Sequence, residues 1–154
     1  MTTRILALAR DVAGSATIEL ALTAPILGAL LIGMVDLSMA FSNKLRLEQV
    51  AQQAIERVQQ NGFTTGQEAT LEAEAQAAAG TGSNADLTFW LECNGVRQAS
   101  TAYTTGCTTP GDTYGRFVEL VIVKTHTPII AARFSQSNSN GTITVRGKAG
   151  IRIQ

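Results

Sequence analysis

The chain has 154 residues, which suffices for one domain and one or two further helices. Its 12 basic and 12 acidic side chains balance, and no block of like charge stands out, which argues against nucleic-acid binding. Hydrophobic residues make up 45% of the chain and concentrate in residues 18–35. The remainder is rich in small and polar residues and predicts a modest globular part.

Residues 15–35 form an apolar stretch in which Glu19 is the one ionisable side chain. A helix from Ser15 to Asp36 is roughly 31 Å long, close to the ~30 Å hydrocarbon core of a bilayer. The alternative is a buried core helix of a soluble protein, but the rest of the chain is too small and too polar to surround one. We therefore expect a transmembrane helix.

The charges around this stretch predict its direction. Arg4 and Arg10 precede it, whereas Asp36, Lys44 and Arg46 follow it, which places the N-terminus in the cytoplasm. We expect a single-pass protein of the bacterial inner membrane with its C-terminal part in the periplasm, where a disulfide can persist. An ordinary secretory signal fits poorly, because the apolar region is too long and the small residues come before it.

Glu19 lies about one helical turn inside the apolar stretch, where a charged side chain has a partial insertion cost. The carboxylate either reaches the headgroups or is protonated, or it meets a positive partner during assembly. A cut between Gly14 and Ser15 would supply such a partner, because Ser15 would then carry an amine of pKa about 7.7–8.0. Glu19 would be the fifth residue of the processed chain, and its pairing with a neighbour's amine would set the register between helices.

Pro25 lies inside the same stretch and frees the carbonyl of Ala21, which predicts a kink or a loosened turn. Gly28 and Gly33 would let other helices approach closely. Proline and glycine are also commoner in membrane helices than in soluble ones, so a bending or packing role and no special role both remain open.

Beyond the membrane, residues 37–62 are predicted to continue the helix as an amphipathic segment. Its apolar side chains recur at spacings of three and four: Leu47, Val50, Ala51, Ala54, Ile55 and Val58. Asn61 and Gly62 predict its end, because both residues accept left-handed backbone angles. A second helix is expected over residues 65–79, where the spacing of Glu68, Glu72 and Glu74 favours a solvated face over a cation site.

Three later stretches predict strands. Residues 87–91 alternate between apolar and polar, residues 117–123 suit a central strand covered on both faces, and residues 142–154 predict a half-buried antiparallel strand. The expected fold class is α+β: a long N-terminal helix with a membrane-spanning first half and an amphipathic second half, a short second helix, and a small antiparallel sheet packed on the long helix.

Cys93 and Cys107 flank a loop rich in Gly, Thr and Ser. A structural disulfide would close a loop of about 15 residues. A zinc site or a reactive thiol is the alternative, but it lacks companions, because His126 is the one histidine and no second cysteine pair exists. Catalytic residue sets and phosphate-binding loops are missing as well, so we expect no enzyme, no metal and no cofactor.

These features together resemble a known family. The short leader ending in Gly14, followed by SATIEL and an apolar helix, is similar to a type IV prepilin processing site. More narrowly, GSATIELALTAPILGALLIGMVDLSMAF resembles the TadE-like pseudopilins of tight-adherence (Flp-type) pili. The cysteine pair, the segment RFVELVIVKTHTPI and the closing TITVRGKAGIRIQ follow in an order typical of that family, so the resemblance covers most of the chain.

The resemblance implies that a prepilin peptidase cuts between Gly14 and Ser15. Residues 1–14 would be the leader, 15–36 the transmembrane segment, 37–62 its amphipathic continuation and 63–154 a periplasmic pilin-like domain. Leu20, where major Flp-type pilins usually have Tyr, favours a minor subunit. The implied partners are the peptidase, other minor pilins, the major Flp-type pilin and the inner-membrane assembly platform.

Two other functions remain open. The chain could be an uncleaved inner-membrane anchor that displays a periplasmic binding domain, but such an anchor needs neither Gly14 nor Glu19. It could also be a pseudopilin of a type II-like secretion system, which shares the processing chemistry. The leader and the order of the C-terminal features favour the tight-adherence system.

Overall fold

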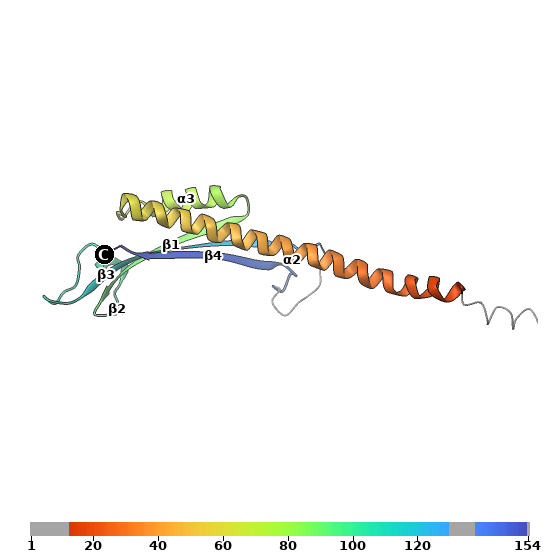
Figure 1. Ribbon diagram of the computed structural model, residues 1–154. Helices are drawn as coiled ribbons and strands as arrows, with labels where there is room; N and C mark the ends of the chain where they lie inside the picture. Colours follow the sequence, from red (N-terminus) through yellow and green to blue (C-terminus); the bar gives the residue numbers. More distant parts are fainter. Residues whose placement is uncertain (1–12, 130–137, 154) are drawn as a thin grey trace, which may run out of the picture. The chain divides into compact units, whose positions relative to one another are not determined.

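The computed structural model describes residues 13–129 and 138–153, with side chains from Thr17 onward (Figure 1). Its elements are α2 (Ala13–Asn61), α3 (Glu68–Ala79), β1 (Ser83–Cys93), β2 (Val96–Arg97), the 3₁₀ turn η1 (Ser100–Tyr103), β3 (Tyr114–His126) and β4 (Ile143–Arg152). The chain divides into a first unit, Met1–Ser38, and a second unit, Met39–Gln154, and α2 contributes to both. The predicted α+β class is confirmed.

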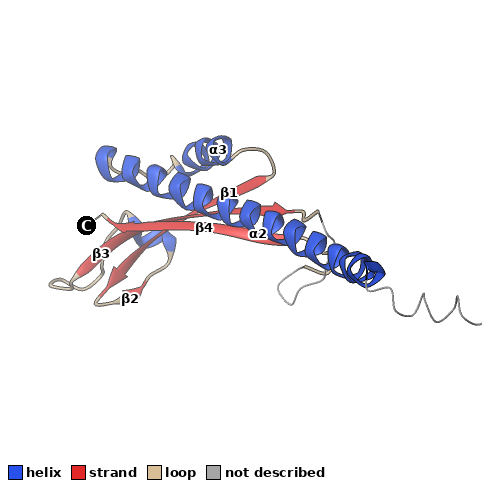
Figure 2. Ribbon diagram, turned by 45° about the vertical axis from the view of Figure 1, so that its right-hand side comes forward, coloured by secondary structure: helices blue, strands red, loops and turns tan. Residues whose placement is uncertain are grey.

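The second unit has its helices on one face of its sheet, as Figure 2 shows for α3 and for the later part of α2. The predicted apolar stripe of α2 forms the centre of this contact: Leu47 is 1% exposed, Ala51 is fully buried and Val58 is 2% exposed. α2 ends at Asn61, and Gly62 follows with φ +77°, the left-handed angle expected there.

α3 begins three residues later than predicted, at Glu68 rather than Thr65. The intervening residues form a turn, in which the Gln67 N–H donates to the Thr64 carbonyl at 3.2 Å and Gly66 has φ +103°. The Glu68 carboxylate accepts a hydrogen bond from the Gly66 N–H at 2.7 Å. Because these groups satisfy the turn, the helix starts only after it.

The sheet has the strand order β2-β1-β3-β4, and every neighbouring pair is antiparallel. β3 is central, as predicted for residues 117–123. The alternation predicted for the last strand is also confirmed, with Val145 buried between the exposed Thr144 and Arg146. Side chains that point toward the helices form the core, including Leu87, Val118 and Leu120.

The expectation that β3 is covered on both faces is wrong. Among the described residues the helices cover one face only, and on the opposite face Phe117 and Val121 are half-buried. Part of that face is covered by its own side chains. The Trp90 and Phe117 rings stack at 5.5 Å, the Arg97 guanidinium lies 4.1 Å from the Trp90 ring centre, and Arg152 lies 6.0 Å from that of Phe117. This row of aromatic and cationic groups crosses all four strands.

At Gly147 the backbone of α2 lies very close to β4. A Cβ at this position would lie 2.3 Å from the Leu47 carbonyl carbon and 2.6 Å from the Glu48 nitrogen, both of them backbone atoms of α2. Backbone atoms cannot rotate away as a side chain can, so the absence of a side chain at Gly147 allows the helix to pack on β4.

We predict that Gly147→Ala lowers the free energy of unfolding of the second unit by roughly 1–3 kcal/mol, the usual range for an overpacked contact. Trp90 is the chain's one tryptophan and lies in this unit, so its fluorescence during urea unfolding reports the change. Gly33→Ala is the matched control, because a Cβ there meets no atom within 4 Å. Equal stability of both variants would contradict the packing role of Gly147.

Candidate functional site

The apolar part of α2 in the first unit has no cover from the described residues. Its large hydrophobic side chains range from 41% exposed at Ile32 to 71% at Leu37. Fully burying one such side chain is worth about 1.5–3 kcal/mol, so leaving this many in water is unfavourable. α2 is the one helix in the described part of the chain that is long and apolar enough to cross a membrane. This is consistent with a membrane-anchored protein.

Glu19 is exposed on this apolar surface. Among the described residues, its carboxylate has no hydrogen-bond or ion-pair partner. Water, headgroups or another protein would therefore have to compensate its charge. The structure places Glu19 on α2 as the sequence predicted, without a partner from within the described chain.

The predicted cleavage position lies on the same helix. The described part of α2 starts at Ala13, so the backbone of Gly14 and Ser15 is helical. Ser15 and Glu19 are four residues apart, which places them on one face with about 6 Å of rise between them.

α2 continues through Pro25. Two residues before the proline, the Thr23 hydroxyl donates to the Glu19 carbonyl at 3.0 Å, which satisfies a polar group on an apolar surface. Near Gly28 and Gly33 no described atom lies within 4 Å of an added Cβ. Both glycines therefore leave room for a neighbouring helix.

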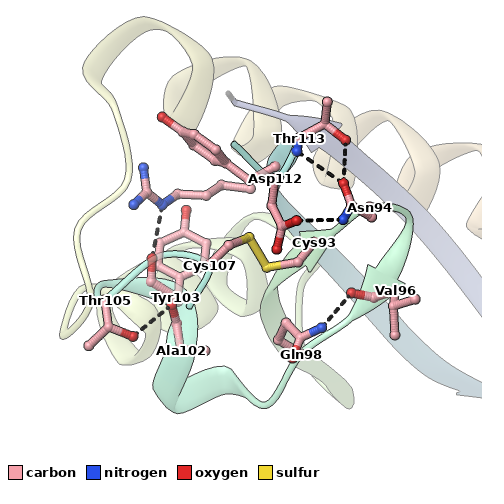
Figure 3. The surroundings of a disulfide bond; sticks show 12 residues. Cys93, Asn94, Val96, Gln98, Ala102, Tyr103, Thr105, Cys107, Asp112 and Thr113 are labelled. Atoms are coloured by element: carbon pink, nitrogen blue, oxygen red, sulfur yellow. Dashed lines mark hydrogen bonds between the residues drawn. A yellow bond between two sulfur atoms is a disulfide. The ribbon is translucent and has the colours of Figure 1, made fainter. Parts of the chain in front are cut away.

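Cys93 and Cys107 form a disulfide with a Cα–Cα distance of 5.9 Å (Figure 3). Cys93 is the last residue of β1, and Cys107 follows η1. The bond therefore links the loop that follows β2 to the end of β1. This is the structural role expected for the two cysteines.

Asn94 also holds this loop, through hydrogen bonds to the residues that directly precede β3. Its Nδ2 donates to Asp112 Oδ1 at 2.7 Å, and its Oδ1 accepts from the backbone N–H and the hydroxyl of Thr113 at 3.1 and 3.0 Å (Figure 3). Asn94 has φ +50°, a backbone angle that asparagine tolerates better than most residues. The disulfide and these bonds hold both ends of the loop.

Tyr103 holds the middle of the loop against the core. Its ring contacts Phe63 at 5.7 Å and Phe89 at 5.1 Å, and its carbonyl accepts a hydrogen bond from Arg116 Nε at 2.9 Å. Burial raises the pKa of the Tyr103 phenol, an effect that the nearby Arg116 guanidinium opposes. Sequence reasoning missed this cluster, because Tyr103 lies in a polar stretch without periodicity.

The glutamates of α3 have three different roles. Glu74 is exposed, as predicted, and pairs with Arg57 at 2.6 Å. Glu68 closes the turn before the helix, and Glu72 accepts a hydrogen bond from the Leu87 N–H at 2.8 Å. In the described part of the chain, no group of three or more His, Cys, Asp or Glu side chains is placed to hold a metal ion.

His126 is the last residue of β3, at the strand end expected from the sequence. Its Nε2 is buried and has no hydrogen-bond partner among the described residues.

We predict that replacing both cysteines, Cys93→Ser and Cys107→Ser, lowers the free energy of unfolding of the second unit by ~3 kcal/mol, because the open loop gains entropy in the unfolded chain. Urea unfolding followed by Trp90 fluorescence measures the change. Reductant should destabilise the unaltered protein by a similar amount and leave the double variant unchanged. A double variant as stable as the unaltered protein would contradict the role of the bond.

Residues 14–55 match the family model described as TadE-like protein. No curated protein and no solved structure matches the chain. The match runs from Gly14 through Glu19 and Pro25 and reaches Ile55 in the stripe that packs on the sheet. The resemblance to TadE-like proteins is thereby confirmed over this segment, and it associates the protein with tight-adherence pili.

Proposed function

We propose that the chain is a minor pseudopilin of a tight-adherence (Flp-type) pilus, processed by a prepilin peptidase and active in pilus assembly or priming. One observation carries the proposal: the TadE-like match begins at Gly14, the residue that precedes the proposed cut. The match also contains Glu19 and the whole exposed apolar part of α2. A role in assembly accounts for these features together.

The physical basis is the pairing of two charges that lipid disfavours singly. A carboxylate in a membrane helix costs up to about 2.5–3.5 kcal/mol at the centre of the span, and less near its end. Two opposite charges 4 Å apart attract by about 4 kcal/mol at an effective dielectric constant of 20. An amine freed at Ser15 of one subunit and Glu19 of its neighbour would therefore compensate each other.

In this proposal α2 is inserted in the bacterial inner membrane with the N-terminus in the cytoplasm and the second unit in the periplasm. The partners are the prepilin peptidase, other minor pilins, the major Flp-type pilin and the inner-membrane assembly platform. The protein acts through contacts rather than catalysis. The exposed apolar surface of α2 supports this role, because lipid can cover it before assembly and neighbouring helices after it.

We predict that the mature protein begins at Ser15. The intact mass of membrane-extracted protein should be lower by residues 1–14 in cells with an active peptidase. Gly14→Val should leave the chain at full length, because a side chain would block the approach of an extended backbone to the enzyme. Ala13→Val is the matched control and should still be processed.

A full-length chain in peptidase-competent cells would instead support an uncleaved inner-membrane anchor. That result would refute processing without changing the fold of the second unit.

We also predict that Glu19→Ala and Glu19→Gln insert into the membrane and are processed but strongly reduce piliation, because both remove the charge that meets the amine. Membrane fractionation, intact mass and the yield of sheared filaments measure the three properties separately. Leu22→Ala, one turn away on the same exposed surface, should leave piliation nearly unchanged. Normal piliation of both Glu19 variants would remove the role assigned to this carboxylate.

A further inference from the structure

Among the described residues, β4 lies at the edge of the sheet, with β3 as its one partner strand. Its ten residues, Ile143–Arg152, contain no proline. It pairs with β3 in an unbroken register from His126↔Ile143 to Phe117↔Arg152. A regular edge of this length is a template on which a further strand can form.

The register shows which backbone groups of β4 point away from the sheet. The Ile153 N–H donates to the Arg116 carbonyl at 2.8 Å, so odd-numbered residues of this segment bond to β3. In an antiparallel pair the N–H and C=O groups of alternate residues point to opposite sides. Thr144, Arg146, Lys148 and Gly150 therefore direct their backbone groups to the open side, and no described residue bonds to these groups.

The opposite edge of the sheet, β1, is partly paired by the chain itself. The Leu87 N–H of β1 donates to Glu72 of α3 at 2.8 Å, and the Leu91 carbonyl accepts from the Gln98 N–H at 2.7 Å. The end of β1 pairs with β2. Ala85 and Phe89 of β1 also direct backbone groups outward without partners among the described residues, but those of β4 form the longer uninterrupted row.

The open edge is also basic. β4 carries Arg146, Lys148 and Arg152, all exposed and on the face opposite the helices, and it contains no acidic residue. Lys148 pairs with Glu119 of β3 at 2.9 Å, whereas Arg146 has no acidic partner among the described residues. A strand added at this edge would therefore lie beside positive side chains in the middle of β4.

We propose that the β4 edge binds an extended acidic segment of another protein, which adds a fifth strand and places carboxylates opposite Arg146 and Lys148. Backbone hydrogen bonds to the open side would give affinity, and the facing charges would select the segment. The inference goes beyond the proposed pilin function and depends only on the second unit.

A second copy of the chain is a poor occupant of the same edge. If two β4 strands paired antiparallel around Gly147, Arg146 of one copy would face Lys148 of the other. In the next register that keeps the same faces together, the pair is centred on Lys148. The two Lys148 side chains would then face each other. Like charges directly opposite each other are destabilising, so the basic residues oppose self-pairing and favour a carboxylate-bearing strand.

The test uses the full chain in detergent and a short fluorescein-labelled peptide with glutamate and threonine in alternation. Fluorescence anisotropy should show binding that weakens as salt is added. Replacing the glutamates by glutamine should weaken binding about tenfold, since each facing pair contributes a few tenths to one kcal/mol. N-methylation of the peptide amides that face β4 should abolish binding.

Matched variants locate the site. Arg146→Gln should weaken binding roughly threefold, by the loss of one facing pair, whereas Arg57→Gln, which removes one positive charge from the exposed α2–α3 ion pair, should not change it. Hydrogen exchange measured by NMR should show new protection of the Thr144, Arg146, Lys148 and Gly150 amides on peptide binding.

Three results would overturn the proposal. These are equal binding of the glutamate and glutamine peptides, unchanged exchange of the four outward amides, and dimerisation of the full chain through β4. None of them bears on the processed mass at Ser15 or on the effect of Glu19, so failure here is distinguishable from failure of the proposed function.

Discussion

The contact between the apolar stripe of α2 and the helix-facing side of the sheet organises the second unit. Leu47, Ala51 and Val58 are almost fully buried in it, opposite strand residues such as Val118 and Leu120. The contact is close because Gly147 lacks a side chain at the point where the α2 backbone meets β4. α3 packs on the same face and extends the core. The disulfide-closed loop adds Tyr103 at the end of β1.

The apolar side chains of α2 are covered differently in the two units. In the second unit the apolar residues of α2 lie on one stripe, and the chain's own strands cover them. In the first unit apolar residues occupy all sides of the helix, and no described residue covers them. A helix that is apolar on all sides is typical of a buried or membrane-spanning segment. The exposed carboxylate of Glu19 also has no partner in the described chain, so water, headgroups or another protein has to compensate its charge.

The second unit also has groups without partners in the described chain, at the edge of β4. Its outward backbone groups lack partners from the described chain, whereas Glu72 and Gln98 bond to two of the outward groups of β1. The row formed by Trp90, Phe117 and two arginines explains how the sheet face opposite the helices remains partly exposed. The rings stack on each other and on the guanidinium groups, so little of their apolar area faces water.

Much of this protein follows from the sequence alone. The length of the apolar stretch, the period of the stripe on α2, the helix end at Gly62 and the alternation in β4 depend on residues close together in the chain. They therefore predict α2 and β4 at nearly their observed bounds, whereas β2 is not predicted. The family resemblance depends equally on local residues, from Gly14 through Glu19, and residues 14–55 match the TadE-like family.

Only the tertiary structure decided which groups remain without partners. The register of β3 and β4, the close approach at Gly147 and the capping of Leu87 by Glu72 join residues that are far apart in the chain. Local periodicity carries no information about such pairs. For that reason the sequence predicted a β3 covered on both faces, whereas in the described part of the chain the helices cover one face and the other is half-buried.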